Sequence, residues 1–217
     1  GKPEDYLGFH KVKKPGLPKI FIPTTSGTGS EVTWVSVLTT ENETKVVIYS
    51  YYLLADIVMV DPQLTLSLPP KITAYTGMDA LSHAIEAFTS VDSSLLTDIY
   101  AERAIEYIGR SLRPAVLRGD KYLRARYEMS VAALLAGLAF SNAGCSIAHA
   151  MALPLGSKYH LPHGLSCALM LPWCMEFMYI ANPVKFARVS KLLGGKTEEL
   201  TILESATESI NLVQKLE

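Results

Sequence analysis

A change of hydrophobic pattern at Pro69 and Pro70 constrains the fold of this chain more than any other feature. Before these prolines, apolar residues come in short β-branched runs that are separated by Gly, Pro and polar turns. After them, apolar residues recur at spacings of three and four, which is the period of an amphipathic helix. We therefore predict an α/β segment at residues 1–67, followed by an all-helical domain at residues 68–217.

The α/β segment contains four runs that favour strands. Residues 32–40 and 45–50 flank a polar turn and predict a hairpin at a sheet edge, and residues 19–25 form a shorter run. Residues 55–62 are an apolar run closed by Asp61 and Pro62, which is typical of a buried strand. Since an exposed hairpin edge invites pairing with a second copy, we expect a homodimer.

The helical domain begins with three long periodic segments, at residues 73–88, 95–112 and 121–140, and four more helical segments follow. The opening loop, residues 1–18, has no hydrophobic period, and the last segment stops without a Gly or Pro signal. We therefore expect this chain to be a piece of a longer protein.

The composition limits the classes of partner. Of the 217 residues, 49% are apolar and 19% are charged, and the formal net charge is -1, which argues against a disordered tail and against nucleic-acid binding. No apolar stretch reaches the ~20 residues that a membrane span needs. The number of cysteines is odd, and no two of them form a CxxC pair: they are Cys145, Cys167 and Cys174. This argues against a disulfide framework and against a structural zinc site. We expect a cytoplasmic protein that acts on small molecules.

Four side chains are candidates for a metal site. Asp79 and His83 are four residues apart on one predicted helix face, although a solvated Asp and a capping His would look the same. His149 lies in an apolar helix, where a buried imidazole needs partners for its ring nitrogens, and His163 follows a proline where a new helix begins. The polar context of His160 favours a position on the surface or behind the ligands.

One carboxylate and three imidazoles suit iron or zinc better than magnesium or calcium, which prefer all-oxygen shells. Such an ion lowers the pKa of an alcohol oxygen and prepares the adjacent carbon to lose hydride. The donor set therefore favours alcohol-dehydrogenase chemistry.

Three motifs resemble, in order and spacing, signatures of the iron-containing (group III) alcohol dehydrogenases: PTTSGTGSEVT, VDPQLTLSLPPKITAYTGMDALSHAIEAF and HAMALPLGSKYHLPHG. The resemblance covers essentially the whole chain. It implies a mostly helical α+β fold of the dehydroquinate-synthase-like type. The chain would hold the C-terminal part of an α/β NAD(P)-binding domain and a truncated all-helical metal-binding domain, without the first part of the cofactor domain and without the C-terminal end.

The resemblance also implies the site residues. Asp79, His83, His149 and His163 match the metal ligands, with Fe²⁺ as the expected ion and zinc as the alternative. The residues that match cofactor-contacting positions are Thr24, Thr25, Gly27, Thr28, Gly29, Ser30, Lys45, Leu64 and Leu68. Glycines and hydroxyls in this loop would bring hydrogen-bond donors to phosphate oxygens. The same sequence also fits an ordinary turn in the loop, a surface position for Lys45 and core packing for Leu64 and Leu68.

Two further positions bear on the substrate. Leu153 stands where many relatives carry a histidine near the nicotinamide, which indicates a more apolar pocket or a compensating role for His160. Phe140 matches an aromatic residue that borders the substrate in relatives, and core packing is an equal interpretation.

The leading hypothesis is an oxidoreductase that transfers hydride between a primary alcohol or diol, or its aldehyde, and NAD or NADP. One alternative is a glycerol-dehydrogenase-like or dehydroquinate-synthase-like zinc enzyme, which His83 disfavours because such relatives use fewer histidine ligands. The other alternative is a metal-binding fragment that catalyses nothing by itself.

Overall fold

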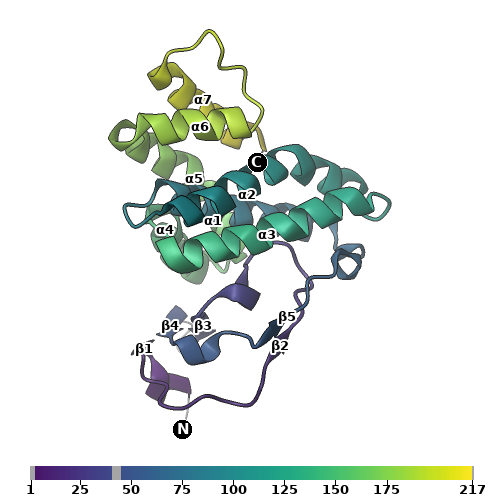
Figure 1. Cartoon of the computed structure of the whole chain (residues 1–217), viewed down its shortest axis with the longest axis vertical. Coiled ribbons are helices and arrows are strands. Elements are labelled where there is room, and N and C mark those ends of the chain that lie inside the picture. The colour runs from purple at the N-terminus through teal and green to yellow at the C-terminus, as the bar shows by residue number, and fades with distance from the viewer. Residues whose placement is uncertain (1–2, 41–44, 217) are drawn as a thin grey trace.

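The computed structural model describes residues 3–40 and 45–216, and within these ranges it contains five short strands and seven α-helices. The strands lie together at the N-terminal end of the molecule, and the helices form a larger block beside them (Figure 1). The change of pattern at the two prolines is therefore a change from strands to helices. The division into two domains stays a prediction.

The strands form two small sheets. In the first, of order β1-β4-β3, β3 (Val35–Thr39) pairs antiparallel with β4 (Lys45–Tyr49), and β1 (Gly8–Phe9) pairs parallel with β4. In the second, β2 (Ile20–Phe21) pairs parallel with β5 (Ile57–Val58). The two strands of the predicted hairpin are confirmed, and its polar turn lies outside the described residues.

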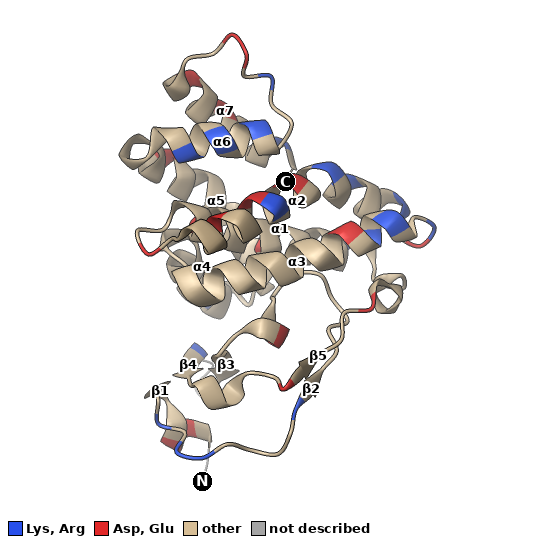
Figure 2. Ribbon diagram, in the orientation of Figure 1, with Lys and Arg blue, Asp and Glu red and all other residues tan. Residues whose placement is uncertain are grey.

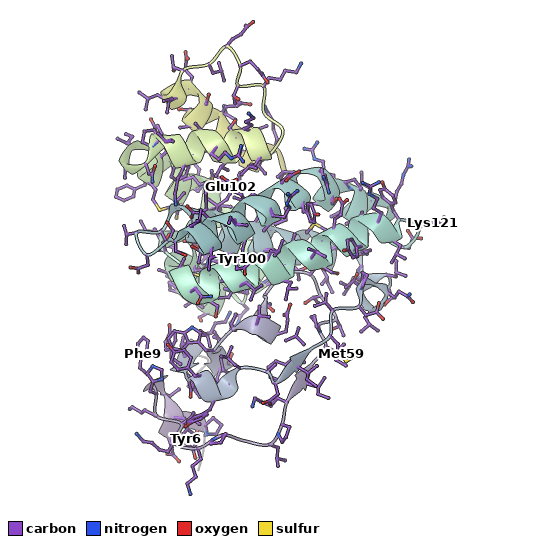
Figure 3. The ribbon with its side chains drawn as sticks, in the orientation of Figure 1. Tyr6, Phe9, Met59, Tyr100, Glu102 and Lys121 are labelled. Carbon is purple, nitrogen blue, oxygen red and sulfur yellow. The ribbon has the colours of Figure 1, made fainter. Side chains whose placement is uncertain are left out.

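The predicted buried strand at residues 55–62 is wrong. Only Ile57 and Val58 are in β5, Ile57 is 53% exposed, and Met59, labelled beside these strands in Figure 3, is 54% exposed. Burial on both faces requires a layer on each side of a strand. Within the described residues β5 pairs with β2 alone, and Ile20 of β2 is itself 57% exposed.

Stacked aromatic rings hold the three-stranded sheet together. The ring of Phe9 stacks on Tyr49 with a centroid separation of 4.2 Å, and Trp34 stacks on Tyr51 at 5.1 Å. Trp34 Nε1 also donates a hydrogen bond to the carbonyl oxygen of Ser141, at 2.8 Å. The aromatic cluster therefore both stabilises the sheet and ties it to the helical block.

The predicted helical segments are confirmed. The helices are α1 (Pro70–Thr89), α2 (Leu95–Arg118), α3 (Leu123–Ala143), α4 (Ile147–Tyr159), α5 (His163–Met178), α6 (Pro183–Leu192) and α7 (Ile202–Leu216). Helix α1 lies at the centre and contacts α2, α3 and α5, and every residue from Gly77 to Phe88 is buried. Alanines on these helices let the backbones approach closely, so charged residues inside α1 are surrounded by protein.

The loop that precedes β3 packs tightly on α3. Ser26 Oγ lies 3.0 Å from Ser130 Oγ, within hydrogen-bond distance. Gly29 has a φ of 59°, and a Cβ atom there would lie 2.6 Å from the Cα atom of Gly137. Two glycines in contact thus bring the loop backbone against the helix, which places the residues beside Gly29 at the edge of the helical block.

Charge is distributed unevenly over the helices. Between Glu128 and Lys158 the chain has no Lys, Arg, Asp or Glu, so the C-terminal half of α3 and most of α4 are drawn without charge colours (Figure 2). The acidic residues of α1, Asp79 and Glu86, therefore lie beside helix surfaces that carry almost no charged side chains.

One stretch, His163–Ala181, meets the length and composition of a membrane span, with a mean hydropathy of 1.4. Helices α3 and α4 reach the length and composition of a membrane span only when they are taken together, and the pair is bent by 105°. Since α5 also packs against α1, α4 and α7, as a core helix does, the expectation of no membrane span stays a prediction.

Candidate metal centre

Three helices bring a carboxylate and three imidazoles to one place. Helix α1 supplies Asp79 and His83, one turn apart, α4 supplies His149 in its first turn, and α5 supplies His163 as its first residue. Asp79 is 2% exposed, His83 5% and His149 9%. The sequence predictions that His149 lies in a helix and that a helix begins at His163 are confirmed.

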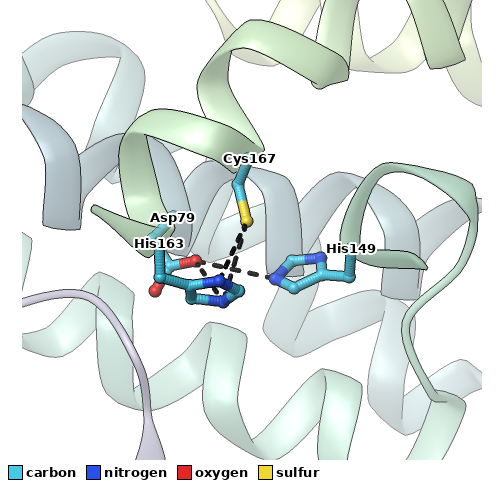
Figure 4. A group of neighbouring side chains, drawn as sticks. All are labelled: Asp79, His149, His163 and Cys167. Atoms are coloured by element: carbon cyan, nitrogen blue, oxygen red, sulfur yellow. Dashed lines mark hydrogen bonds and ion pairs between the residues drawn. The ribbon is translucent and has the colours of Figure 1, made fainter. Parts of the chain in front are cut away.

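The distances among three of these side chains suit the coordination of one ion. Asp79 Oδ1 lies 3.6 Å from His149 Nε2 and 3.6 Å from His163 Nε2. In a tetrahedral shell, bonds of about 2.1 Å place neighbouring donors roughly 3.4 Å apart. Cys167 joins the group with Sγ 3.7 Å from His163 Nε2, as Figure 4 shows.

His83 reaches this group through His149. Its ring stacks on that of His149 at 4.3 Å and on that of Phe140 at 4.1 Å, and it forms a second group of close donor atoms with His149 and Cys145. His160 belongs to neither group; it is exposed and ends α4 with a φ of 53°. The assignment of Asp79, His83, His149 and His163 as the four ligands stays a prediction.

The electrostatics of the cluster favour a cation. Burial raises the pKa of Asp79, but the neighbouring imidazoles outweigh it and leave that pKa below its usual value. Burial lowers the pKa of His83 to about 3, so this imidazole is neutral near neutral pH. Burial also lowers the pKa of His149, but the polar side chains around it, that of Asp79 first, outweigh burial and raise this pKa well above its usual value.

Three buried polar atoms of the cluster have no hydrogen-bond partner within the described residues: Asp79 Oδ1, His83 Nδ1 and His149 Nε2. Leaving such atoms unpaired costs about 1–3 kcal/mol each. A divalent cation would satisfy a carboxylate oxygen and imidazole lone pairs together. The residues therefore fit a metal ion.

Sequence reasoning missed three side chains beside the cluster: Glu86, Cys145 and Cys167. The spacing of the cysteines from one another gives no signal, whereas Cys167 stands four residues after His163, on the same helix face. Glu86 follows Asp79 by two helical turns, and it contacts His149 Nδ1. Spacing measured from His163 would have identified Cys167, whereas only the fold brings Glu86 against His149.

A cleft of 530 Å³ opens beside the cluster, between the helices and the first sheet. It is lined by the four predicted ligands and by other residues that include Phe140, Leu153, Val35 and Val47. Apolar side chains thus border the polar cluster, as in sites that bind small organic molecules.

The predicted cofactor residues divide into two groups. Thr28, Ser30 and Lys45 line the cleft, and the residues that do not are Thr24, Thr25, Gly27, Gly29, Leu64 and Leu68. The two loop glycines have a packing role, since a Cβ atom on Gly27 would lie 2.6 Å from the Cβ atom of Thr76 on α1. Leu64 is 44% exposed in a short 3-10 helix. The structure therefore places hydroxyls and one ammonium, rather than the whole loop, at the cleft.

A helical block that carries a buried Asp–His cluster, with a cleft shared with an α/β segment, is an arrangement suited to a metal-dependent enzyme. The chain belongs to the iron-containing alcohol dehydrogenase family. Residues 1–62 match the family described as iron-containing alcohol dehydrogenase, and residues 73–217 match the C-terminal region of the Fe-containing alcohol dehydrogenase family. The resemblance in the three motifs is thereby confirmed.

Known relatives extend this result. The chain is 49% identical over 221 residues to long-chain-alcohol dehydrogenase 1 of Geobacillus thermodenitrificans. The aligned region covers 100% of the chain and 54% of that relative. A crystal structure of 1,3-propanediol oxidoreductase superposes with a TM-score of 0.96 at 43% identity, over 100% of the chain and 56% of that protein. The structure of sulfoacetaldehyde reductase from Bifidobacterium kashiwanohense, in complex with NAD+, superposes with a TM-score of 0.84 at 36% identity. This superposition covers 98% of the chain and 56% of that protein. The mostly helical fold class is confirmed, and the chain spans about half the length of these relatives.

Proposed function

We propose that the complete protein transfers hydride between a primary alcohol or diol, or its aldehyde, and NAD(P), with a metal ion held by Asp79, His83, His149 and His163. The observation that carries the proposal is the set of buried Asp and His atoms that have no hydrogen-bond partner in the described part of the chain, beside a cleft lined also by Thr28 and Ser30. Relatives named as alcohol and propanediol oxidoreductases support the substrate class.

When bound, a divalent ion at this cluster supplies a Lewis acid that lowers the pKa of an alcohol oxygen. The chain's own residues then have separate tasks. Phe140 and Leu153, which line the cleft, would exclude water from the reacting carbon of a bound alcohol. Thr28 and Ser30 offer hydroxyl donors to the cofactor, and Lys45 offers a positive charge.

The family name and the NAD+ complex of the sulfoacetaldehyde reductase support iron and NAD as the cofactors. Zinc and NADP remain the alternatives, and the Cys167 thiol beside His163 is a donor that zinc accepts well. A cytoplasmic homodimer that binds neither nucleic acid nor membrane stays a prediction.

A second function applies to the 217 residues alone: a metal-binding unit that catalyses nothing by itself. The observation that favours it is the coverage of the relatives, of which this chain spans only about half. Fluorescence of NAD(P)H on addition of the chain and of the complete protein distinguishes the two cases, because binding by the complete protein alone favours the second function.

The decisive test of the metal site is elemental mass spectrometry after anaerobic purification. The wild type should contain close to one iron or zinc per chain, and His83→Ala should lose most of it. His160→Ala is the matched control, since this histidine is exposed and outside both donor groups, and its metal content should not change. Absence of metal from the wild type, or equal loss in both variants, would contradict the proposed ligand set.

A further inference from the structure

We infer that Glu86 is a positioning residue that fixes both the tautomer and the orientation of His149 for metal binding; this inference rests on the proposed metal site. Glu86 lies on α1 and is fully buried, at 0% exposed. A carboxylate removed from water in this way requires several hydrogen-bond donors. The identity and direction of those donors show what Glu86 does.

One oxygen of Glu86 is fully engaged by the start of α4. Glu86 Oε1 accepts hydrogen bonds from Ser146 N at 3.1 Å, Ser146 Oγ at 2.8 Å and Ala148 N at 2.7 Å. Amides at a helix N-terminus lack partners within the helix and carry the positive end of its dipole. The carboxylate therefore docks α4 on α1 and is itself held in one rotamer.

The other oxygen, Glu86 Oε2, contacts His149 Nδ1. An ionised carboxylate can only accept hydrogen bonds, so the ring nitrogen that faces it must carry hydrogen. With the proton on Nδ1, the lone pair of a neutral imidazole is on Nε2. Glu86 therefore selects the tautomer that exposes Nε2 as a ligand atom.

The lone pair selected in this way faces the proposed ion. His149 Nε2 lies 3.6 Å from Asp79 Oδ1, and neither atom has a hydrogen-bond partner within the described residues. The ring of His83, stacked at 4.3 Å, covers one face of the His149 imidazole and limits its rotation. Glu86 and His83 together hold His149 in the direction that binding requires.

Glu86→Gln is a sharp test because it preserves size and removes the acceptor. The three donors around Oε1 hold the amide oxygen of glutamine on their side, so its NH₂ group faces His149 Nδ1. Nδ1 must then accept, and the single ring proton moves to Nε2, where it blocks the metal. Loss of such a partner behind a ligand typically weakens metal affinity about 10–100-fold, and we expect a loss in that range.

Glu128→Gln is the matched control. Glu128 is also a buried carboxylate, at 7% exposed, and it accepts hydrogen bonds from Arg110, Ser111 and Arg124 on α2 and α3. It contacts no residue of the metal cluster among the described residues. We expect Glu128→Gln to lower stability and to bind zinc as tightly as the wild type.

Two measurements on the 217-residue chain decide the matter. Zinc is titrated into the metal-free wild type and both variants in competition with a chelator, and the Nδ1–H signal of His149 is recorded by ¹H–¹⁵N NMR of the zinc-loaded forms. Weak zinc binding and loss of the Nδ1–H signal in Glu86→Gln alone support the inference. Wild-type affinity with the signal retained in Glu86→Gln overturns it, whereas a wild type that binds no zinc contradicts the proposed site itself.

Far-UV circular dichroism shows whether Glu86→Gln folds. If it does not, Glu86→Asp decides, because aspartate still only accepts hydrogen bonds but is one methylene shorter. The inference requires that folded Glu86→Asp keeps the Nδ1–H signal and binds zinc more weakly than the wild type. Wild-type affinity, or loss of the signal, in this variant would show that Glu86 acts only in packing.

Discussion

Replacing Gly29 by alanine tests how the cleft loop is held against α3. Gly29 has a φ of 59°, in the left-handed region, which costs a residue with a Cβ atom about 1–2 kcal/mol. The added Cβ atom would lie 2.6 Å from Gly137 Cα and 3.2 Å from the carbonyl oxygen of Ala133. These are backbone atoms that cannot rotate away, so overpacking adds about 1–3 kcal/mol.

The two terms predict that Gly29→Ala destabilises the chain by about 2–5 kcal/mol. At about 2–4 °C per kcal/mol for a chain of this size, the melting temperature should fall on the order of 10 °C. Thermal unfolding followed by far-UV circular dichroism measures this change. Thr28 and Ser30, which flank Gly29 and line the cleft, would shift with the loop.

Variants of two other glycines separate the cost of the left-handed backbone from the cost of the close contact. Gly194 has a φ of 87° with nothing within 4 Å of its added Cβ atom, so Gly194→Ala reports the backbone term alone. Gly137 is helical, and its added Cβ atom would lie 2.8 Å from Val32 Cγ2, so Gly137→Ala reports the contact, offset by about 1 kcal/mol of helix propensity. If Gly29→Ala lowers the melting temperature no more than Gly194→Ala does, the close approach of loop and helix does not exist.

Two further predictions concern pH. Burial raises the pKa of Glu128, but hydrogen bonds from Arg110, Ser111 and Arg124 outweigh burial and lower this pKa below 4.5. The ionised Glu128 therefore stabilises the fold above pH 4.5, and this stabilisation is lost as the pH falls through the pKa of Glu128 in the folded chain. Urea unfolding should show a wild-type stability that drops between about pH 5 and pH 3, and a shallower drop in Glu128→Gln; equal slopes would contradict this. Leu153→His places an imidazole in the cleft, so kcat/KM of the complete enzyme should gain a pH dependence near neutrality with unchanged metal content, and an unaltered profile would refute the expectation.

The helices could be predicted because their period is local. The predicted segment 73–88 lies within α1, and the segment 95–112 ends six residues before α2 does, at Arg118. Pro114 lies inside α2, although proline removes a backbone hydrogen-bond donor. The helix continues because the next residue, Ala115, is fully buried against the core, and tertiary packing outweighs the lost hydrogen bond.

Features that depend on distant partners could not be predicted in the same way. The apolar run at residues 55–62 indicated burial, but burial depends on layers supplied from elsewhere in the chain. The sequence indicates that a buried His149 needs a partner, but it does not identify Glu86, which lies among apolar neighbours and faces His149 only through tertiary contact. The local pattern thus identified which side chains need partners, and the fold determined which partners they have.

The ligand candidates lie far apart along the chain, and this has a consequence for folding. Asp79 on α1 and His163 on α5 are far apart in sequence but lie 3.6 Å apart in the folded chain, so an ion that joined them would act as a cross-link. Closing a loop of about 84 residues removes unfolded-state chain entropy worth about 4–5 kcal/mol. If the proposed function holds, the ion that serves the reaction would also hold the helices together, so that one binding event would both complete the site and stabilise the fold.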